Sequence, residues 1–371
     1  MTWHEVSLKQ ICGVDWGNTK LTKSSYVDNG KFLAVSAAGA DGLIDHYEHE
    51  ADVPVLSAIG AQCGRMFYPG ERFTAIKNTI TLTPKENMAD GKFLYYLFTH
   101  VELPQRGAGQ PFISKGDIEA FRVSIPESLE EQRKIVEKLD SAFAEITSLE
   151  ENLISRAGLL ELLLQGALSV QYKSAIDNTA NSMRLGEIAD FQGGSQPAKS
   201  NFLYKEQKGY VRFIQIRDFG SDKNLTYIPI ATKNRLCTKS DILIGRYGAS
   251  VGKILTGLDG AYNVALMKVI PKNEIVDRDY LYFYLLSEIF QTNLLNVSDR
   301  SAQNGFSKDD ISGFPVIIPS LREQKRIVAK LAKVRNDILE INLVQLKTKT
   351  ELALLRKSLL SNALTQEEAV A

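Results

Sequence analysis

The sequence is poor in the residues that usually carry catalysis or bind metal. It holds 4 histidines and 3 cysteines in 371 residues, and the cysteines (Cys12, Cys63, Cys237) are far apart. An odd number of widely spaced cysteines gives neither a disulfide framework nor a paired metal-ligand spacing, and it suits a reducing compartment. All four histidines lie in the first copy of the repeat described below, so the two copies share no histidine. We therefore expect a cytoplasmic protein without a repeated catalytic histidine.

Other absences narrow the possible functions further. The chain has no run of about 18 apolar residues, and its first residues lack a basic stretch followed by an apolar one, so we expect neither a membrane span nor a secretory signal. It also lacks the Asn/Asp-Pro-Pro-aromatic tetrapeptide and the glycine-rich loop that an adenine methyltransferase needs. The 44 basic and 44 acidic residues cancel, whereas a protein that binds DNA alone is usually basic. A DNA-binding role would therefore need a partner, or a basic face balanced by acidic faces elsewhere.

The chain repeats itself. Residues 118–126 followed by 131–139 (Glu-Gln-Arg-Lys-Ile-Val…) resemble residues 311–319 followed by 323–331 (Glu-Gln-Lys-Arg-Ile-Val…). Upstream, residues 8–11, 60–66 and 114–118 resemble residues 185–188, 248–254 and 307–311 in the same order. Ordered similarity of this kind indicates two copies of one unit, each a globular part followed by a helical part.

Each globular part mixes short strands with helices, which predicts an α+β fold. In the first copy we expect strands near 32–35, 55–59 and 79–82 and a helix over 91–100. In the second copy we expect strands over 210–217, 241–245 and 265–270 and a helix over 280–290. The predicted parts are two globular domains (1–126 and 183–319), two long helices (127–172 and 320–365), a linker (173–182) and a tail (366–371).

The two long helices each carry one apolar stripe. The first stripe is broken at Glu150 and the second is interrupted by Gln345 and Thr348; the apolar positions are Val136, Leu139, Phe143, Ile146, Leu153, Ala157, Leu160, Leu164 and Ala167, then Leu331, Val334, Ile338, Ile341, Leu352, Leu355 and Leu359. Such a helix, roughly 60–65 Å long, cannot bury its stripe alone. The simplest partner for each is the other, paired antiparallel, which predicts two globular domains related by a pseudo-two-fold axis and separated by a two-helix coiled coil. The alternative is two separate coiled coils with unrelated partners.

Two similar but non-identical domains on a fixed spacer fit two half-sites on duplex DNA, whose groove repeats every ~34 Å. The doubled Ile-Pro…Glu-Gln helix opening resembles the conserved regions of type I restriction–modification specificity (S) subunits. Residues 241–253 (Asp-Ile-Leu-Ile-Gly-Arg-Tyr-Gly-Ala-Ser-Val-Gly-Lys) are similar to a recurrent segment of that family, whereas the first copy lacks the leading Asp and the Arg-Tyr pair. The resemblance covers nearly the whole chain.

The resemblance implies a non-catalytic DNA-binding subunit. Each globular domain would be a target-recognition domain that reads one half of an asymmetric bipartite sequence, and the helices would set the spacer and dock two methyltransferase (M) subunits. Restriction and motor (R) subunits would join the full complex. S-adenosylmethionine, ATP and magnesium would belong to those partners, and this chain would hold no cofactor or metal. The alternatives are a methylation-only complex, a coiled-coil adaptor that binds only protein, and an enzyme with its own active site.

Candidate DNA contacts are polar side chains on loops of the globular domains. They are Lys20, Lys23, Arg65, Arg106 and Gln110 in the first copy, and Lys199, Arg217, Arg246, Lys253, Arg300, Gln303 and Asn304 in the second. Arg65 and Lys253 follow matching glycine turns, which favours phosphate contact, although a solvated turn is an equal alternative. Gln110 and Gln303 match between the copies and could instead cap the helix that follows.

The helix openings are candidate docking sites for the M subunits: Glu131, Gln132, Arg133, Glu323, Gln324 and Lys325. The simpler interpretation is helix initiation, because acidic residues favour the first turn. Two weaker hypotheses remain. Residues 248–253 could form a phosphate-binding loop, but the spacing is one residue short and no Ser/Thr follows the lysine. His46 and His49 could bind metal in their acidic stretch.

Overall fold

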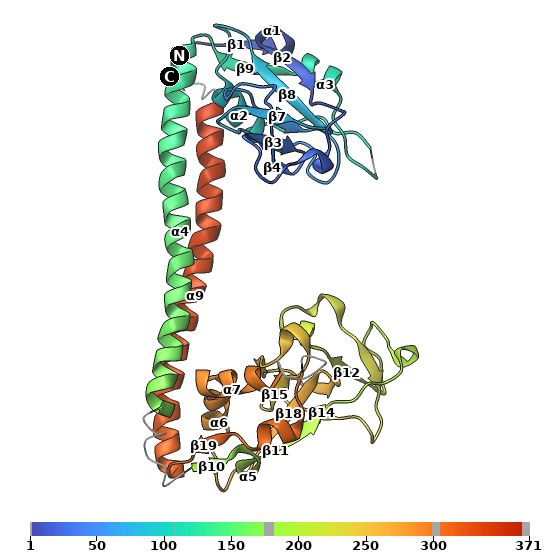
Figure 1. Ribbon diagram of the computed structural model, residues 1–371, viewed down its shortest axis with the longest axis vertical. Helices are drawn as coiled ribbons and strands as arrows, with labels where there is room; N and C mark the ends of the chain where they lie inside the picture. The colour runs from blue at the N-terminus through green and yellow to red at the C-terminus, as the bar shows by residue number, and fades with distance from the viewer. Residues whose placement is uncertain (1, 108, 174–181, 299–304, 366–371) are drawn as a thin grey trace. The chain divides into compact units, whose positions relative to one another are not determined.

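The computed structural model describes residues 2–107, 109–173, 182–298 and 305–365 (Figure 1). The chain divides into two compact units: unit 1 comprises residues 1–154 and 345–371, and unit 2 comprises residues 155–344. Each unit therefore contains one globular part and one portion of each long helix. The two units are described separately.

The globular part of unit 1 contains three small sheets. The first pairs β1 (Trp3–Ser7) with β9 (Arg122–Pro126); the second has the order β2 (Cys12–Trp16), β8 (Thr79–Pro84), β5 (Val55–Ser57), β6 (Met66–Phe67); the third has the order β4 (Gly39–Ile44), β3 (Phe32–Ser36), β7 (Phe73–Ala75). Its helices are α1 (Leu8–Ile11), α2 (Gly91–His100), α3 (Lys115–Ala120) and the short 3-10 turn η1 (Lys23–Ser25). The predicted α+β class is confirmed.

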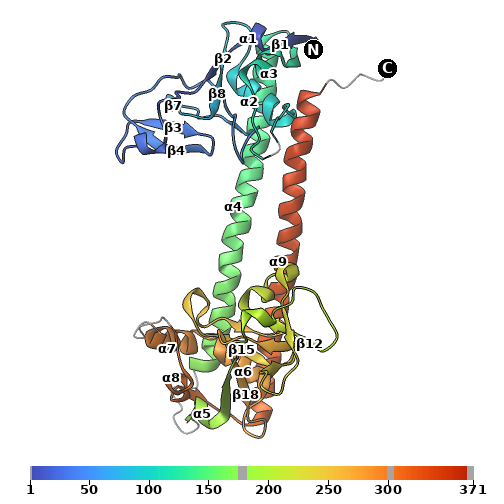
Figure 2. The same ribbon diagram turned by 90° about the vertical axis from the view of Figure 1, so that its right-hand side faces the viewer.

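Unit 2 repeats this topology, with one additional strand, β14, in its third sheet. β10 (Ser182–Arg184) pairs with β19 (Pro315–Ile317), and the second sheet has the order β11 (Ala189–Gly193), β18 (Leu266–Pro271), β15 (Ile242–Gly245), β16 (Ile254–Leu255). Figure 2 labels β15 and β18 of this sheet. The third has the order β13 (Tyr227–Pro229), β12 (Tyr210–Ile214), β17 (Gly260–Tyr262), β14 (Leu236–Cys237). The helices are α5 (Leu185–Ile188), α6 (Arg278–Leu286), α7 (Glu288–Ser298), α8 (Lys308–Ser312) and the 3-10 turns η3 (Lys199–Asn201), η4 (Ile216–Phe219), η5 (Asp222–Asn224) and η6 (Gly248–Ser250). The duplication inferred from sequence is therefore present in the strand order itself.

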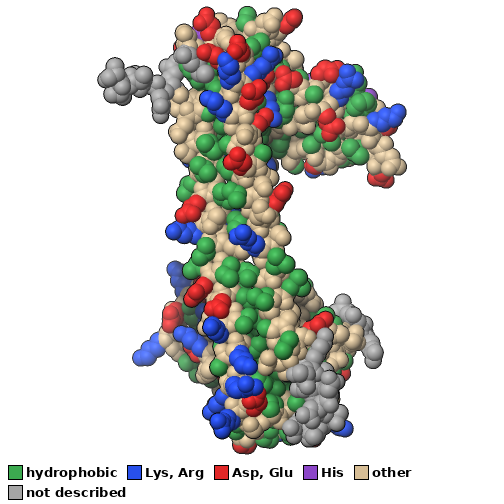
Figure 3. Space-filling view, turned by 90° about the vertical axis from the view of Figure 1, so that its left-hand side faces the viewer, with side chains coloured by type: hydrophobic (Ala, Val, Ile, Leu, Met, Phe, Trp, Pro, Cys, Tyr) green, Lys and Arg blue, Asp and Glu red, His purple; other side chains and the backbone are tan. Residues whose placement is uncertain are grey.

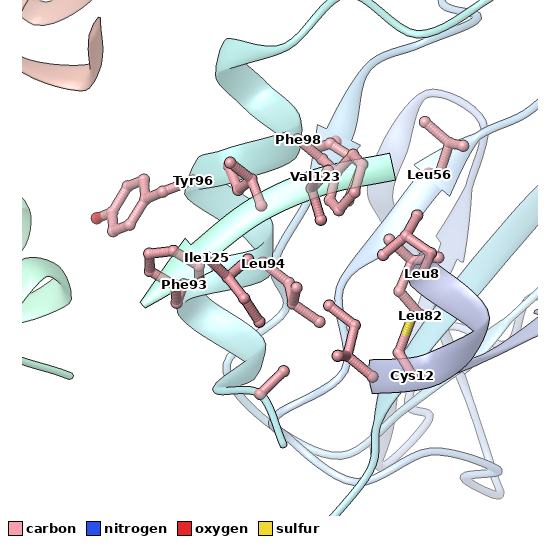
Figure 4. Packing of buried hydrophobic residues seen from close by; sticks show 14 of the residues in the cluster. Leu8, Cys12, Leu56, Leu82, Phe93, Leu94, Tyr96, Phe98, Val123 and Ile125 are labelled. Atoms are coloured by element: carbon pink, nitrogen blue, oxygen red, sulfur yellow. The ribbon is translucent and has the colours of Figure 1, made fainter. Parts of the chain in front are cut away.

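The core of unit 1 forms where α2 packs against the sheets. Asp90 caps this helix by accepting a hydrogen bond from Phe93 N at 2.9 Å, and Phe93, Leu94 and Phe98 on the helix are almost fully buried. Figure 4 shows Phe98 near Val123 of β9, and Phe93 and Leu94 near Ile125 of the same strand. Full burial of a large apolar side chain contributes on the order of 1.5–3 kcal/mol to stability. The buried side chains of α2 therefore hold this helix against the sheet.

The prediction of a single helix over residues 280–290 is wrong, because two helices occupy this segment. α6 ends at Leu286 and α7 begins at Glu288, with Ser287 between them in extended conformation. Ser287 Oγ donates to Tyr284 O at 2.6 Å, which satisfies a carbonyl at the end of α6. Apolar residues on both sides of the break kept the helical period, so the sequence pattern did not reveal it.

Two long helices complete both units: α4 (Leu129–Lys173, 45 residues) and α9 (Leu321–Leu364, 44 residues). In unit 1, Leu360 and Leu364 near the end of α9 join the same core as Leu139 near the start of α4. In unit 2 the roles are exchanged, because Leu168 near the end of α4 joins the same core as Leu331 near the start of α9. Within each unit, the start of one long helix therefore packs with the end of the other, as predicted for an antiparallel pair.

Parts of the predicted stripes lie outside this core. Ile341 is 44% exposed and Leu355 is 47% exposed, and Ala157 is also exposed. Two other positions of the predicted stripe on α9, Ile338 and Leu352, are buried and lie fourteen residues apart. The stripe on α9 is thus narrower than the sequence pattern indicated, because a two-helix seam covers less of each helix than a bundle does.

Candidate nucleic-acid interface

The two glycine turns that follow β5 and β15 have the same hydrogen bonds. In unit 1, Ser57 N donates to Arg65 O (2.8 Å) and Gly64 N donates to Ser57 O (2.9 Å). In unit 2 the same bonds run from Gly245 N to Lys253 O (2.9 Å) and from Gly252 N to Gly245 O (3.0 Å). Gly64 and Gly252 have φ of 89° and 81°, which favours glycine. This hydrogen-bonded turn, which we call the turn frame, therefore presents one exposed basic side chain at the same place in each unit, Arg65 in unit 1 and Lys253 in unit 2.

The same turn excludes the phosphate-loop hypothesis. A phosphate-binding loop leaves its backbone N–H groups free to face the anion. Here Val251 N donates to Gly248 O, Gly252 N to Gly245 O, and Lys253 N to Ser250 O. These three N–H groups are occupied within the turn, so they cannot face an anion as a phosphate-binding loop requires.

The other candidate residues of unit 1 lie on exposed loops, and two of them have acidic partners. Lys20 is exposed in the loop after β2 and Gln110 is exposed in the segment before α3. Lys23 pairs with Asp41, and Arg106 pairs with Asp117. Gln110 does not cap α3, because the Ser114 side chain accepts the hydrogen bond from Asp117 N; the capping interpretation of Gln110 is wrong.

In unit 2, Lys199 is exposed at the start of η3, and Arg217 is exposed in η4 with an ion pair to Asp218 at 3.7 Å. Arg246 is half-buried; its Nε donates to Phe306 O at 3.3 Å, and its guanidinium lies over the Tyr247 ring at 5.1 Å. Three further candidates, namely Arg300, Gln303 and Asn304, lie outside the described residues.

Unit 1 has a hollow of about 340 Å³ among these loops. Its lining comes from η1, the β3–β4 turn, the β5–β6 turn and the β7–β8 loop; among the lining residues are Lys23, Gln62, Lys77 and Asn78. Two lysines and two amides give the hollow donors and acceptors of the kind that contact phosphates and base edges. Sequence reasoning missed Gln62, Lys77 and Asn78, although Gln62 lies in the repeated glycine turn and Lys77 and Asn78 directly precede the strand predicted near 79–82.

No metal site accompanies this interface in the part of the chain that the structure describes, where no cluster of three or more potential metal-ligating side chains occurs. His46 lies 3.7 Å from Glu48. His49 stacks on the Phe73 ring at 5.0 Å, and its partial burial lowers its pKa. The metal hypothesis for His46 and His49 therefore has no support.

Comparison with known proteins decides the family. The family described as "Type I restriction modification DNA specificity domain" matches residues 1–157 and 178–351. The chain belongs to this family. It is 22% identical to the type I restriction enzyme EcoDI specificity subunit of Escherichia coli, over 90% of this chain and 81% of that one, and 26% identical to the MjaVIII specificity subunit of Methanocaldococcus jannaschii, over 43% and 37%.

Solved structures agree on the fold. A chain from a structure that reports the "structural basis underlying complex assembly and conformational transition of the type I R-M system" matches with a TM-score of 0.75 at 19% identity, covering 98% of this chain and 97% of that one. The HsdS subunit from Thermoanaerobacter tengcongensis matches with a TM-score of 0.54 at 20% identity, covering 98% and 96%. The chain is thus a DNA specificity (S) subunit of a type I restriction–modification system, itself non-catalytic and without its own cofactor, as the resemblance implied.

The helix openings of this S subunit show why Glu-Gln occurs twice. Gln132 is 0% exposed; its Oε1 accepts from Asp90 N (2.9 Å), and its Nε2 donates to Pro126 O (3.1 Å) and Met88 O (3.4 Å). The side chain therefore joins the start of α4 to β9 and to the cap of α2.

Gln324 makes the matching set of bonds in unit 2. It is also 0% exposed; its Oε1 accepts from Asp277 N (2.7 Å), and its Nε2 donates to Pro319 O (2.8 Å) and Ile275 O (3.0 Å). We call each of these three-bond arrangements a glutamine clamp. Since both side chains are buried within their own unit, the prediction that Gln132 and Gln324 contact a partner is wrong.

The neighbouring docking candidates remain at the surface. Arg133 and Lys325 are exposed, and Glu131 and Glu323 are half-buried. Neither glutamate is the helix cap, because Ser128 Oγ accepts from Glu131 N (3.2 Å) and the corresponding serine of unit 2, Ser320, does the same for Glu323. Docking through these four side chains stays a prediction.

Both long helices carry large hydrophobic side chains that are exposed, and Figure 3 shows hydrophobic side chains at the surface of one face of the molecule, among polar and charged ones. Within α4, an 18-residue window has a mean hydropathy of 1.4 and only 6% of it is buried, so by length and composition α4 could cross a membrane. The expectation of no such segment, based on uninterrupted apolar runs, therefore overlooked this window. A single helix of this kind is weak evidence for a membrane, and the end of α4 packs into the core of unit 2 through Leu168 and Tyr172. The exposed leucines still require a physical explanation.

Proposed function

We propose that each globular part of this S subunit reads one half of a bipartite DNA target. The observation that carries the proposal is a shared backbone frame with different side chains on it. The turn that presents Arg65 in unit 1 presents Lys253 in unit 2 with the same hydrogen bonds. The shared backbone turn would place each unit on the DNA backbone in the same way. The loop residues that differ between the units would then read different base sequences.

Backbone contacts would come from the exposed basic side chains. Lys20, Arg65, Lys199 and Lys253 are exposed on loops, and no ion pair to another described residue occupies them. Lys23 and Arg106 have acidic partners, so their net attraction for a phosphate is smaller. A modest basic surface agrees with the zero net charge of the chain if the M subunits supply further phosphate contacts.

The direct experiment is methylation of a random DNA library. The chain would be co-expressed with the M subunit encoded beside it, and the methylated positions would be read by sequencing. A bipartite motif with a fixed gap supports the proposal. Methylation without a fixed bipartite motif, or methylation by the purified chain alone, contradicts it and favours an enzyme with its own site. No DNA affinity even with the M subunit present favours a protein-binding adaptor.

We also propose that helix length sets the gap between the half-sites. At ~1.5 Å per residue, the 45 residues of α4 extend roughly 68 Å, which is about two turns of DNA. Adding or deleting one heptad near Glu150 is expected to change the gap and leave both half-sequences unchanged. Altered half-sequences with an unchanged gap would contradict the role of the helices as a spacer.

Two M subunits would dock on the exposed leucines of the long helices. Aligned on the glutamine clamps, Leu162 and Leu163 of α4 correspond to Leu354 and Leu355 of α9. All four are between 47% and 67% exposed, whereas the next matched pair of leucines is buried, Leu168 in the core of unit 2 and Leu360 in the core of unit 1. Each unit therefore carries one equivalent exposed leucine pair, which gives two equal apolar sites for two copies of one partner.

The docking site can be tested in one unit while the other serves as reference. Replacing Leu354 and Leu355 together by Glu is expected to reduce the number of bound M subunits from two to one in native mass spectrometry. Lys357→Glu is the matched control, because this exposed neighbour undergoes the same change in charge without loss of apolar surface. Retention of two M subunits by the double variant would contradict the assignment.

Association with R subunits, a methylation-only complex, absence from membranes and a cytoplasmic location remain predictions. Cleavage of unmethylated plasmid by extracts that contain the whole operon would distinguish a restriction complex from a methylation-only complex.

A further inference from the structure

The β7–β8 loop of unit 1 and its counterpart in unit 2 occupy the same place in the frame. Ile76 forms an isolated bridge with Asn18, and Asn263 forms the matching bridge with Ser195. Two residues then lead into the next strand in each case: Lys77 and Asn78 before β8, and Val264 and Ala265 before β18.

Backbone hydrogen bonds confirm this equivalence. Asn78 O accepts from Ala58 N (2.9 Å), and Ala265 O accepts from Arg246 N (2.9 Å). The first residue of each following strand is also bound alike; Thr79 O accepts from Gly17 N (2.9 Å) and Leu266 O from Gly194 N (3.0 Å). The loop positions therefore correspond, Lys77 with Val264 and Asn78 with Ala265, but only Asn78 has a positive φ.

The side chains on this shared scaffold have opposite chemistry. In unit 1, Lys77 is exposed and Asn78 is half-buried at the edge of the hollow. No ion pair or side-chain hydrogen bond to another described residue occupies either of them. In unit 2, Val264 is 37% exposed and belongs to none of the hydrophobic clusters found among the described residues.

Folding explains only part of this difference. Asn78 has φ of 72°, a conformation that asparagine tolerates better than most residues. Asn87, the other asparagine with positive φ in unit 1, has φ of 59° and lies outside the hollow. Backbone conformation accounts for an asparagine at 78, but it accounts neither for its place in the hollow nor for an exposed valine at 264.

We propose that this loop is a base-reading position in both units, by hydrogen bonding in unit 1 and by apolar contact in unit 2. The inference rests on the proposed function. The carboxamide of Asn78 matches the N6 donor and N7 acceptor of adenine in the major groove, and the methyl groups of Val264 match the C5 methyl of thymine. Lys77 contacts the adjacent phosphate. One adenine in one half-site and one thymine in the other are thereby assigned to matched loops, read from the second loop position in unit 1 and from the first in unit 2.

The test uses the complete methyltransferase complex on a random DNA library, with the motif read by sequencing of methylated sites. Asn78→Gly preserves the left-handed backbone and removes the amide. It is expected to lower discrimination at a single adenine of one half-site by roughly tenfold or more, with the other half unchanged. Asn78→Asp also tolerates this backbone, and because a carboxylate only accepts hydrogen bonds, it is expected to shift the preference there toward cytosine.

Val264→Ser is expected to weaken the preference for a single thymine in the opposite half-site. Asn87→Gly is the matched control, because it changes the other left-handed asparagine of unit 1 away from the hollow. A wild-type complex without a bipartite motif would refute the proposed function itself. A bipartite wild-type motif that neither Asn78 variant alters, or that loses strength evenly at all positions, would overturn only the base-reading role.

Discussion

Removal of one glutamine clamp should destabilise one unit and leave the other unchanged. Gln132→Ala deletes the side chain that bonds Asp90 N, Pro126 O and Met88 O in unit 1. Gln324→Ala deletes the matching bonds in unit 2. Because both side chains are fully buried, water cannot replace the lost partners without opening the start of the long helix.

The size of the effect follows from the bonds lost. A buried hydrogen bond contributes about 1 kcal/mol net, and each group left unsatisfied costs about 1–3 kcal/mol. Three bonds, one of them long at 3.4 Å in unit 1, give an expected loss of about 2–4 kcal/mol in the free energy of unfolding of that unit. The bonds of Gln324, at 2.7–3.0 Å, are shorter, so Gln324→Ala should have the larger effect.

The positions of the tryptophans make the assay specific for one unit. The chain has 2 tryptophans, Trp3 and Trp16, and both belong to unit 1. Tryptophan fluorescence during urea unfolding therefore reports unit 1, while far-UV circular dichroism reports both units. Gln132→Ala should lower the fluorescence midpoint by on the order of 1 M urea, and Gln324→Ala should leave it unchanged but introduce an early transition in the dichroism.

Exposed charged positions on the same helices provide the controls. Glu137→Ala and Lys333→Ala remove exposed side chains from the first part of α4 and of α9. If Gln132→Ala unfolds at the same midpoint as Glu137→Ala, the clamp contributes nothing and the doubled glutamine needs another explanation. If Gln324→Ala moves the fluorescence midpoint as far as Gln132→Ala does, the effect is not confined to one unit.

Three further predictions concern single side chains. Arg65→Ala and Lys253→Ala should each lower DNA affinity of the complex without changing the motif, and should reduce the slope of log affinity against log salt by about 1; an unchanged slope would exclude phosphate contact. Burial acts to raise the pKa of Asp241, but hydrogen bonds from Lys268 and Thr238 hold it below its usual 3.8, so this carboxylate stabilises unit 2 above pH 3.8 and the stabilisation is lost as pH falls through the folded pKa. Asp241→Asn should cost about 1 kcal/mol at pH 7 and flatten that acid dependence of unfolding; equal acid sensitivity in both proteins would contradict this. Cys63 should react with iodoacetamide before the other two cysteines, whose burial raises their pKa to about 12 and about 11, and mass spectrometry of partly labelled protein would show the order.

The duplicated architecture could be predicted because several independent sequence patterns indicate it, namely repeated segments, helix caps and apolar spacing. The helix over 91–100 matches α2 at both ends, since Asp90 is a strong cap and apolar residues follow at helical spacing. The repeat placed the glycine turns of Arg65 and Lys253 in correspondence, and their hydrogen bonds agree. Local patterns of this kind depend on neighbouring residues, which a sequence displays directly.

Features that depend on tertiary contacts were predicted less well. The two clamp glutamines looked like surface residues, because nothing local shows that a polar side chain at the start of a long helix is covered by an adjacent loop and strand. Exposure of Ile341 and Leu355 was missed because periodicity gives the direction of a stripe and not its width. The leading Asp241 looked like part of a functional segment, whereas its carboxylate accepts from Thr238 N (2.7 Å) and Lys268 Nζ (2.7 Å) and stabilises the turn before β15.

The candidate interface was predictable in outline and not in detail. Arg65 and Lys253 could be found by comparing the two copies around glycine. The two-residue loops that contain Asn78 and Val264 could have been found by the opposite comparison, namely by looking for matched loops whose side chains differ, but burial and strand starts had to be known first. Residues that read different bases must differ between the two copies. A search for positions that are similar in both copies therefore does not find them.

Exchange of residues 1–126 for the corresponding segment of another family member tests the central claim most directly. The hybrid would be co-expressed with the M subunit, and its methylated motif compared with that of the parent chain. We predict that one half of the bipartite motif changes to a new sequence while the other half and the gap stay the same. A change in both halves, or in neither, would contradict two independent readers on one chain.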